Sequence, residues 1–206
     1  MRAQWITQDV IWTAWQQPGL EHLQLTEQED QVLADSLLIG MHKQKPFRVR
    51  YTIVCDLQWQ VRRLSLDLLS GGGQAIELWS DGNGQWTTQS GFAVSALDGC
   101  LDLDLAVTPF PHSLAIRRLA LNPGESAEVK AVHLTVPKIK LQTSQQRYTC
   151  LATGSEANVE GNAGDKPEGG LYRYENLGTG IQVELRLDAK GLVIDYPEAF
   201  RRVWSQ

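Results

Sequence analysis

The chain has 206 residues, of which 42% are hydrophobic and 21% are charged. These proportions are typical of one globular domain, so they argue against a disordered or collagen-like chain. The formal net charge of −5 argues against a nucleic-acid binder and against constant docking on anionic lipid.

The first half of the sequence predicts β-strands. Residues 11–15 and 20–25 flank Pro18-Gly19, a turn signal in which glycine supplies the positive φ, and they predict an opening hairpin. The clearest predicted strand covers residues 47–55, where apolar and polar side chains alternate without interruption. A period of two over this length indicates a strand with one buried face.

A change of phase follows this strand. Residues 57, 59 and 61 are apolar, but the apolar positions then shift to 64, 66 and 68. One extra residue near Arg62-Arg63, in a β-bulge, accounts for the shift and would curl the sheet. The glycine run 71–73 ends this segment, and the turn residues 81–84 predict another hairpin.

The rest of the chain also predicts strands, with one exception. Further strands are predicted at 101–107, 116–121, 127–136, 139–141, 147–151, 171–174, 181–187 and 192–195. Residues 197–204 predict a helix, because Pro197 suits a first turn and Arg201 and Arg202 suit a last turn. The polar segment 153–170 predicts a mobile surface loop.

These elements predict an all-β fold, with a single curled antiparallel sheet and one short C-terminal helix. We expect residues 1–206 to form one domain.

The three widely spaced cysteines argue against a disulfide framework and indicate a reducing compartment. No stretch approaches the roughly 20 apolar residues of a membrane span, and no secretory signal is recognisable. We therefore expect a cytoplasmic protein without a transmembrane segment.

An acidic cluster is the most suggestive candidate for chemistry. Asp98, Asp102 and Asp104 follow one another, and the last two share a strand face. Three interpretations stay open: a solvated strand face, pairing with Arg63 or Arg118, or a site for acid–base catalysis or a divalent cation.

Motifs for cofactors are weak. The pair Gly82-x-Gly84 lacks the third glycine and the following helix of a dinucleotide loop, and the four histidines lack the spacing of zinc ligands. We expect no cofactor, no metal and no catalytic residue.

Several stretches, in order along almost the whole chain, resemble the putative glycolipid-binding family of bacterial proteins. They are residues 18–23, 51–56, 97–105, 108–110, 116–119, 146–148 and 191–197. The resemblance implies a spiral β-roll that wraps around an elongated hollow, similar in shape to carriers of bacterial lipoproteins. It implies no catalytic residue.

The resulting expectation is a non-enzymatic protein that binds a lipid or glycolipid in the hollow of the roll and binds no nucleic acid. The expected ligand-binding residues are Trp59, Arg63, Asp98, Asp102, Asp104, Arg118 and Tyr148.

An enzyme that acts on a small polar substrate through the carboxylates is one alternative. An interaction or scaffold protein with a filled interior is another. An open apolar cavity favours binding, a packed interior favours the scaffold, and carboxylates that converge in a cleft favour the enzyme. The sequence contains no signal for an oligomeric state.

Overall fold

A computed structural model describes residues 6–154 and 169–206 of the chain, and its strands form one open sheet. The predicted loop 153–170 therefore lies mostly outside the described residues. The fourteen strands are β1 (Ile6–Ala14), β2 (Leu20–Glu27), β3 (Val32–His42), β4 (Lys45–Cys55), β5 (Val61–Leu68), β6 (Gln74–Ser80), β7 (Trp86–Thr88), β8 (Asp102–Leu105), β9 (Ser126–Thr135), β10 (Lys140–Thr153), β11 (Gly170–Asn176), β12 (Gln182–Leu187), β13 (Val193–Tyr196) and β14 (Phe200–Ser205).

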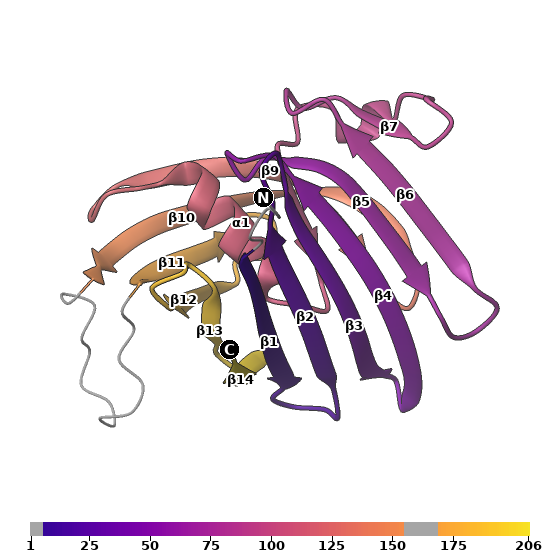
Figure 1. Ribbon diagram of the computed structural model, residues 1–206, viewed down its shortest axis with the longest axis horizontal. Helices are drawn as coiled ribbons and strands as arrows, with labels where there is room; N and C mark the ends of the chain where they lie inside the picture. Colours follow the sequence, from indigo (N-terminus) through magenta and orange to yellow (C-terminus); the bar gives the residue numbers. More distant parts are fainter. Residues whose placement is uncertain (1–5, 155–168) are drawn as a thin grey trace, which may run out of the picture.

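The sheet consists of two meanders joined in the middle. Its order is β7-β6-β5-β4-β3-β2-β1-β14-β13-β12-β11-β10-β9-β8, so the first and last strands are neighbours. All neighbours pair antiparallel except β8 and β9, which pair parallel. The sheet curls so that its two halves face each other (Figure 1). The predicted all-β fold with a single curled sheet is confirmed.

The details predicted around β4 are also confirmed. Its alternate residues Phe47, Val49, Tyr51, Ile53 and Cys55 are all buried. Where β4 pairs with β5, Val54 lies opposite Arg63 but Cys55 lies opposite Val61. Arg62 is thus the extra residue of a bulge, as the change of hydrophobic phase predicted.

The prediction of a C-terminal helix at 197–204 was wrong. Residues 200–205 form β14, which pairs with β1 and β13. Phe200, Val203 and Trp204 suit a helical stripe, but the ladder bonds available on both sides of β14 outweigh that local preference.

The predicted strand at 116–121 was also wrong, because these residues belong largely to the helix α1 (Phe110–Leu119). Pro111 lies in its first turn, where a missing N–H costs nothing, and Arg117 and Arg118 lie in its last turn. Its first seven residues are buried, so it lacks the apolar–polar alternation that would have revealed its period.

Helix α1 lies between the two halves of the sheet (Figure 1). Phe110 and Leu114 belong to one hydrophobic cluster with residues of β1 to β5, and Ala115 and Ile116 belong to a second cluster with residues of β9 to β13. Much of the interior is therefore packed with side chains. None of the described helices combines the length and the hydrophobicity that crossing a membrane would require.

Candidate functional site

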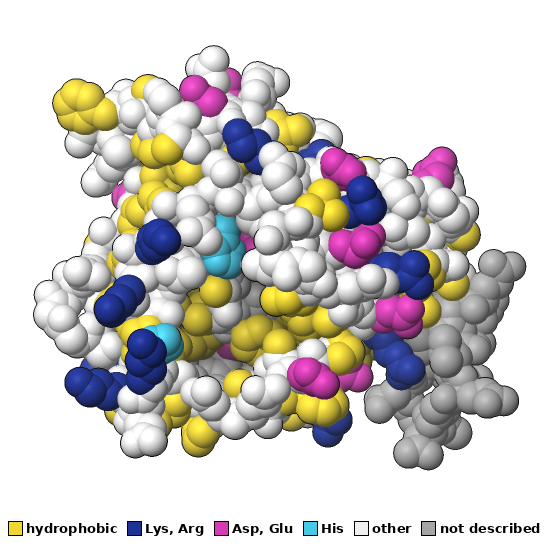
Figure 2. Space-filling model, turned by 180° about the vertical axis from the view of Figure 1, so that it is seen from behind, with side chains coloured by type: hydrophobic (Ala, Val, Ile, Leu, Met, Phe, Trp, Pro, Cys, Tyr) yellow, Lys and Arg dark blue, Asp and Glu magenta, His cyan; other side chains and the backbone are white. Residues whose placement is uncertain are grey.

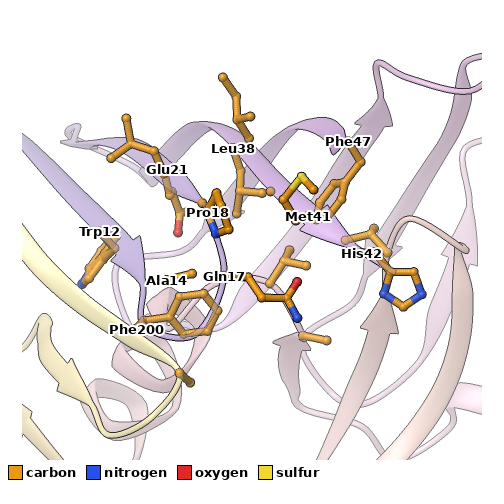
Figure 3. A pocket seen from close by; sticks show the side chains of 18 of the residues that line it. Trp12, Ala14, Gln17, Pro18, Glu21, Leu38, Met41, His42, Phe47 and Phe200 are labelled. Atoms are coloured by element: carbon orange, nitrogen blue, oxygen red, sulfur yellow. The ribbon is translucent and has the colours of Figure 1, made fainter. Parts of the chain in front are cut away.

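A pocket remains open at one end of the roll, and we call that end the mouth. The pocket has a volume of about 480 Å³ and lies among the β1–β2 turn, the tip of the β3–β4 hairpin, the segment after β8, the end of β9 and the β13–β14 turn. Its walls include Trp12, Leu38, Phe47, Val107, Val136 and Phe200. Figure 3 shows aromatic and aliphatic side chains from these separate segments around one space.

Glu21 places a carboxyl group at the edge of this apolar space. It lies on β2 in phase with Leu23 and Leu25, so the strand directs all three side chains to the concave face. The residue is only 2% exposed, and its side chain is seen among the pocket side chains in Figure 3. A mostly apolar pocket thus has one buried acidic side chain in its lining.

The hydrogen bonds of Glu21 are one-sided. Ser36 Oγ and the Tyr51 hydroxyl donate to Glu21 Oε1 over 2.8 and 2.5 Å. Glu21 Oε2 has no hydrogen-bond partner among the described residues. Burial raises the pKa of Glu21, and the nearby hydroxyls of Thr108, Tyr51 and Ser36 lower it by less. The Thr108 hydroxyl lies 3.5 Å from the Tyr51 hydroxyl and makes no hydrogen bond of normal geometry to Glu21. The carboxyl group therefore gains more from a new donor or from protonation than an exposed glutamate would.

A second polar group lies in the interior, away from the pocket lining. Asp104 Oδ2 accepts hydrogen bonds from His133 Nδ1 at 2.8 Å and from Gln146 Nε2 at 2.7 Å. The Tyr148 hydroxyl donates to Gln146 Oε1 and lies 2.8 Å from His112 Nδ1. Burial favours a higher pKa for Asp104, but the hydrogen bonds and the nearby histidines together lower it. This carboxylate is well satisfied.

Asp102 pairs with Arg118. Arg118 Nε and NH2 donate to the two carboxylate oxygens over 2.9 and 2.6 Å, and the two side chains are only 15% and 5% exposed for Arg118 and Asp102. Of the three interpretations of the acidic cluster, pairing with an arginine describes Asp102. A solvated strand face is contradicted, because every residue of β8 is buried.

The three other predicted residues each contact a different partner. Trp59 has a positive φ of 64° in the β4–β5 turn, and Arg117 stacks on its ring. Arg63 lies beside the ring of Trp79, with its Nε buried and without a partner among the described residues. Asp98 is exposed, and its backbone carbonyl accepts a hydrogen bond from Lys130.

The structure thus links Asp104 with Tyr148 through Gln146, and Asp102 with Arg118. None of the seven predicted residues is among those that line the mouth pocket. Their role in ligand binding stays a prediction.

Sequence reasoning did not select Glu21, although a signal was present. A glutamate shares strand parity with Leu23 and Leu25, which indicates a carboxyl group on the buried face. A buried acid needs a partner, so this position was a candidate for a functional side chain.

Comparisons with known proteins agree with this architecture. A family model described as putative glycolipid-binding matches residues 9–202. The chain is also similar to the crystal structure of a DUF1089 family protein from Pseudomonas aeruginosa, with 32% identity and a TM-score of 0.76. That match covers 93% of this chain and 92% of the other. No curated protein matches the chain.

Proposed function

Because the chain belongs to the putative glycolipid-binding family, we propose that it binds an amphipathic lipid or glycolipid in the mouth pocket and catalyses no reaction on it. The observation that carries this proposal is an open, largely apolar pocket with one buried carboxyl group in its lining. Its volume of about 480 Å³ falls within the range of roughly 300–1,000 Å³ that is usual for small-molecule sites.

The pocket walls suit the apolar part of such a ligand. Trp12, Phe47 and Phe200 offer aromatic surface that can cover methylene groups or the apolar face of a sugar ring. Burial of methylene groups from water contributes about 0.8 kcal/mol each. Burial therefore favours binding of a short acyl segment or of one apolar ring face, against the entropic cost of association.

Glu21 suits a polar head group that donates a hydrogen bond. A buried oxygen without a partner costs about 1–3 kcal/mol, and a ligand hydroxyl that reaches Glu21 Oε2 would recover part of this cost. We propose that Glu21 orients the ligand in this way.

The alternatives receive less support. The enzyme hypothesis relied on free carboxylates in a cleft, but Asp102 and Asp104 are engaged by Arg118, His133 and Gln146 and do not line the pocket. The scaffold hypothesis relied on a filled interior. Helix α1 does fill much of it, but the space at the mouth remains open.

A pocket-filling substitution tests the site. Ala14 lines the pocket from the end of β1, so Ala14→Trp should occupy part of the space. Ala75→Trp adds the same side chain at an exposed position of β6 and serves as the control. With octyl glucoside or dodecanol as the probe, calorimetry should show one site per chain, at least tenfold weaker in Ala14→Trp and unchanged in Ala75→Trp. If neither probe binds the unmodified protein, or if both variants bind equally well, the proposal is contradicted.

Carboxyl-carbon NMR tests the role of Glu21. A hydroxyl that donates to the carboxylate stabilises its charged form, so octyl glucoside should lower the pKa of Glu21. If the glucoside binds and leaves the titration of Glu21 unchanged, the head group does not reach this carboxyl group.

A further inference from the structure

Four of the seven lysines of the chain lie on two neighbouring hairpin tips. Lys43 lies in the turn between β3 and β4 and Lys45 begins β4, while Lys138 lies in the turn between β9 and β10 and Lys140 begins β10. All four are exposed. We call these four residues the lysine rim.

The two tips lie together beside the mouth pocket. A hollow of about 450 Å³ is lined by Lys45 and Pro46 from one tip and by Pro137 and Lys138 from the other. The mouth pocket is also lined from both tips, by residues 40–42 and 47 and by residues 135–136. Figure 2 shows Lys and Arg side chains gathered beside a hollow in which hydrophobic side chains are visible.

The positive charge of the rim is not neutralised locally. None of its four lysines forms a salt bridge within the described part of the chain. The stretches 36–54 and 129–150, which contain the rim, have no acidic residue. Glu198 is the exposed acid in the pocket lining, and it comes from the β13–β14 turn. A chain with net charge −5 thus has a basic edge at its mouth.

Apolar side chains are exposed at the same end. Trp15 follows β1 directly, and Leu20 and Ile39 pair across β2 and β3; these three residues are 46%, 49% and 50% exposed. Tryptophan and lysine together suit a membrane surface, because the indole ring favours the headgroup level and lysine favours anionic lipid.

We propose that the lysine rim docks the mouth of the roll on an anionic lipid bilayer. This surface goes beyond ligand binding, because it brings the pocket to the place where amphipathic molecules reside. The net charge of the whole chain argued against constant docking on anionic lipid. The local arrangement of charge supports it, since attraction to a membrane falls off within about a Debye length and depends on the residues that face the surface.

Co-sedimentation with vesicles tests the proposal. The unmodified protein should bind vesicles that contain 30% phosphatidylglycerol at low salt and should not bind pure phosphatidylcholine vesicles. A rim variant combines Lys43→Asn, Lys45→Gln, Lys138→Gln and Lys140→Gln; asparagine is used at 43 because that backbone has a positive φ of 47°. If each lysine changes the membrane partition coefficient about fivefold, which corresponds to ~1 kcal/mol, the partition coefficient of the rim variant should be at least about 100-fold lower than that of the unmodified protein.

A control variant removes the same number of charges elsewhere, through Arg147→Gln, Arg173→Gln, Arg186→Gln and Lys190→Gln. It should bind anionic vesicles as the unmodified protein does. Equal loss in both variants would reduce the effect to net charge and overturn the proposal, and so would failure of the unmodified protein to bind. Rim-dependent binding to DNA or to an acidic protein, with no binding to vesicles, would also overturn it. Ala14→Trp should retain vesicle binding, so a failure of the pocket and a failure of the rim are distinguishable.

Discussion

The roll buries acidic side chains in two regions, and the hydrogen-bond partners of these side chains differ between the regions. In the pocket region, Glu21 receives hydrogen bonds from uncharged hydroxyl groups on one oxygen, and burial raises its pKa. In the closed interior, Asp104 receives hydrogen bonds from His133 and Gln146, and its pKa falls despite burial. Both residues are buried, so the chemistry of the partners accounts for the opposite directions of the two pKa shifts.

Asp102 extends the contrast. Arg118 satisfies both of its oxygens with a fork of two donors, which is the strongest pairing available to a carboxylate. The interior region thus supplies donors to its carboxylates, and the pocket region leaves one carboxyl oxygen without a partner among the described residues. The closed interior is expected to contribute to stability, and the pocket to bind the ligand.

The largest expected effect comes from breaking the Asp102–Arg118 pair. Arg118→Ala leaves a buried carboxylate without compensation and should lower the free energy of unfolding by about 3–5 kcal/mol. Urea denaturation followed by tryptophan fluorescence measures the change. As a control, Arg173→Ala removes a more exposed pair with Glu184 and should cost less than about 1 kcal/mol. A loss below about 1 kcal/mol in Arg118→Ala would show that the pair is not structural.

A smaller effect is expected from Asp104→Asn, which should lower the free energy of unfolding by about 1–3 kcal/mol. This is the usual cost of impaired hydrogen bonding to a buried group. The difference between wild type and variant should depend on pH. The lowered pKa of Asp104 contributes stability that disappears as pH falls through its folded value. The raised pKa of His133, caused first by its hydrogen bond to Asp104, contributes stability that disappears as pH rises through its folded value.

Denaturation series at several pH values should therefore give a difference in the free energy of unfolding between wild type and Asp104→Asn. This difference should be largest between the folded pKa values of Asp104 and His133. A difference independent of pH would show that the pair does not couple to protonation.

The smallest effect on the free energy of unfolding is expected for Glu21→Gln, and this substitution should stabilise the protein rather than destabilise it as pH rises. Because the folded pKa of Glu21 is raised, wild type loses stability as pH rises from the unfolded pKa through the folded one. Glutamine keeps an acceptor for Tyr51 and Ser36 but does not ionise. The variant should therefore gain stability relative to wild type as pH rises, by about 1.4 kcal/mol for each unit of pKa elevation. Parallel pH profiles for the two proteins would mean that Glu21 ionises as freely in the fold as in the unfolded chain.

Much of the sheet was predictable because its residues obey strand periodicity locally. The alternation in β4 and the bulge at Arg62 can be read from spacing alone. The helix α1 could not be read this way, because its first seven residues are all buried, His112 and Ser113 included, so polarity does not mark an exposed face. The strand β14 could not be read either, since its pairing with β1 depends on residues almost the whole chain away.

The candidate site was less predictable than the fold. The carboxylates Asp102 and Asp104 stood out as a cluster, but clustering in sequence says nothing about whether arginine or histidine neutralises them in space. The mouth pocket is assembled from five separate segments, so only the completed roll brings Glu21, Val136 and Phe200 to one space. The lysine rim has the same origin, because its two tips meet only after the sheet has curled.

The pairing of β1 with β14 has a consequence for how the chain folds. Most other neighbours in the sheet are joined by short connections, so each meander can grow hairpin by hairpin with little loop-closure entropy. The contact between Val10 and Ser205 spans nearly the entire chain and adds strongly to the contact order. We expect this seam to form late, after both meanders exist. Until it forms, β1 and β14 are both open edges able to pair with another molecule, and aggregation during refolding would begin there.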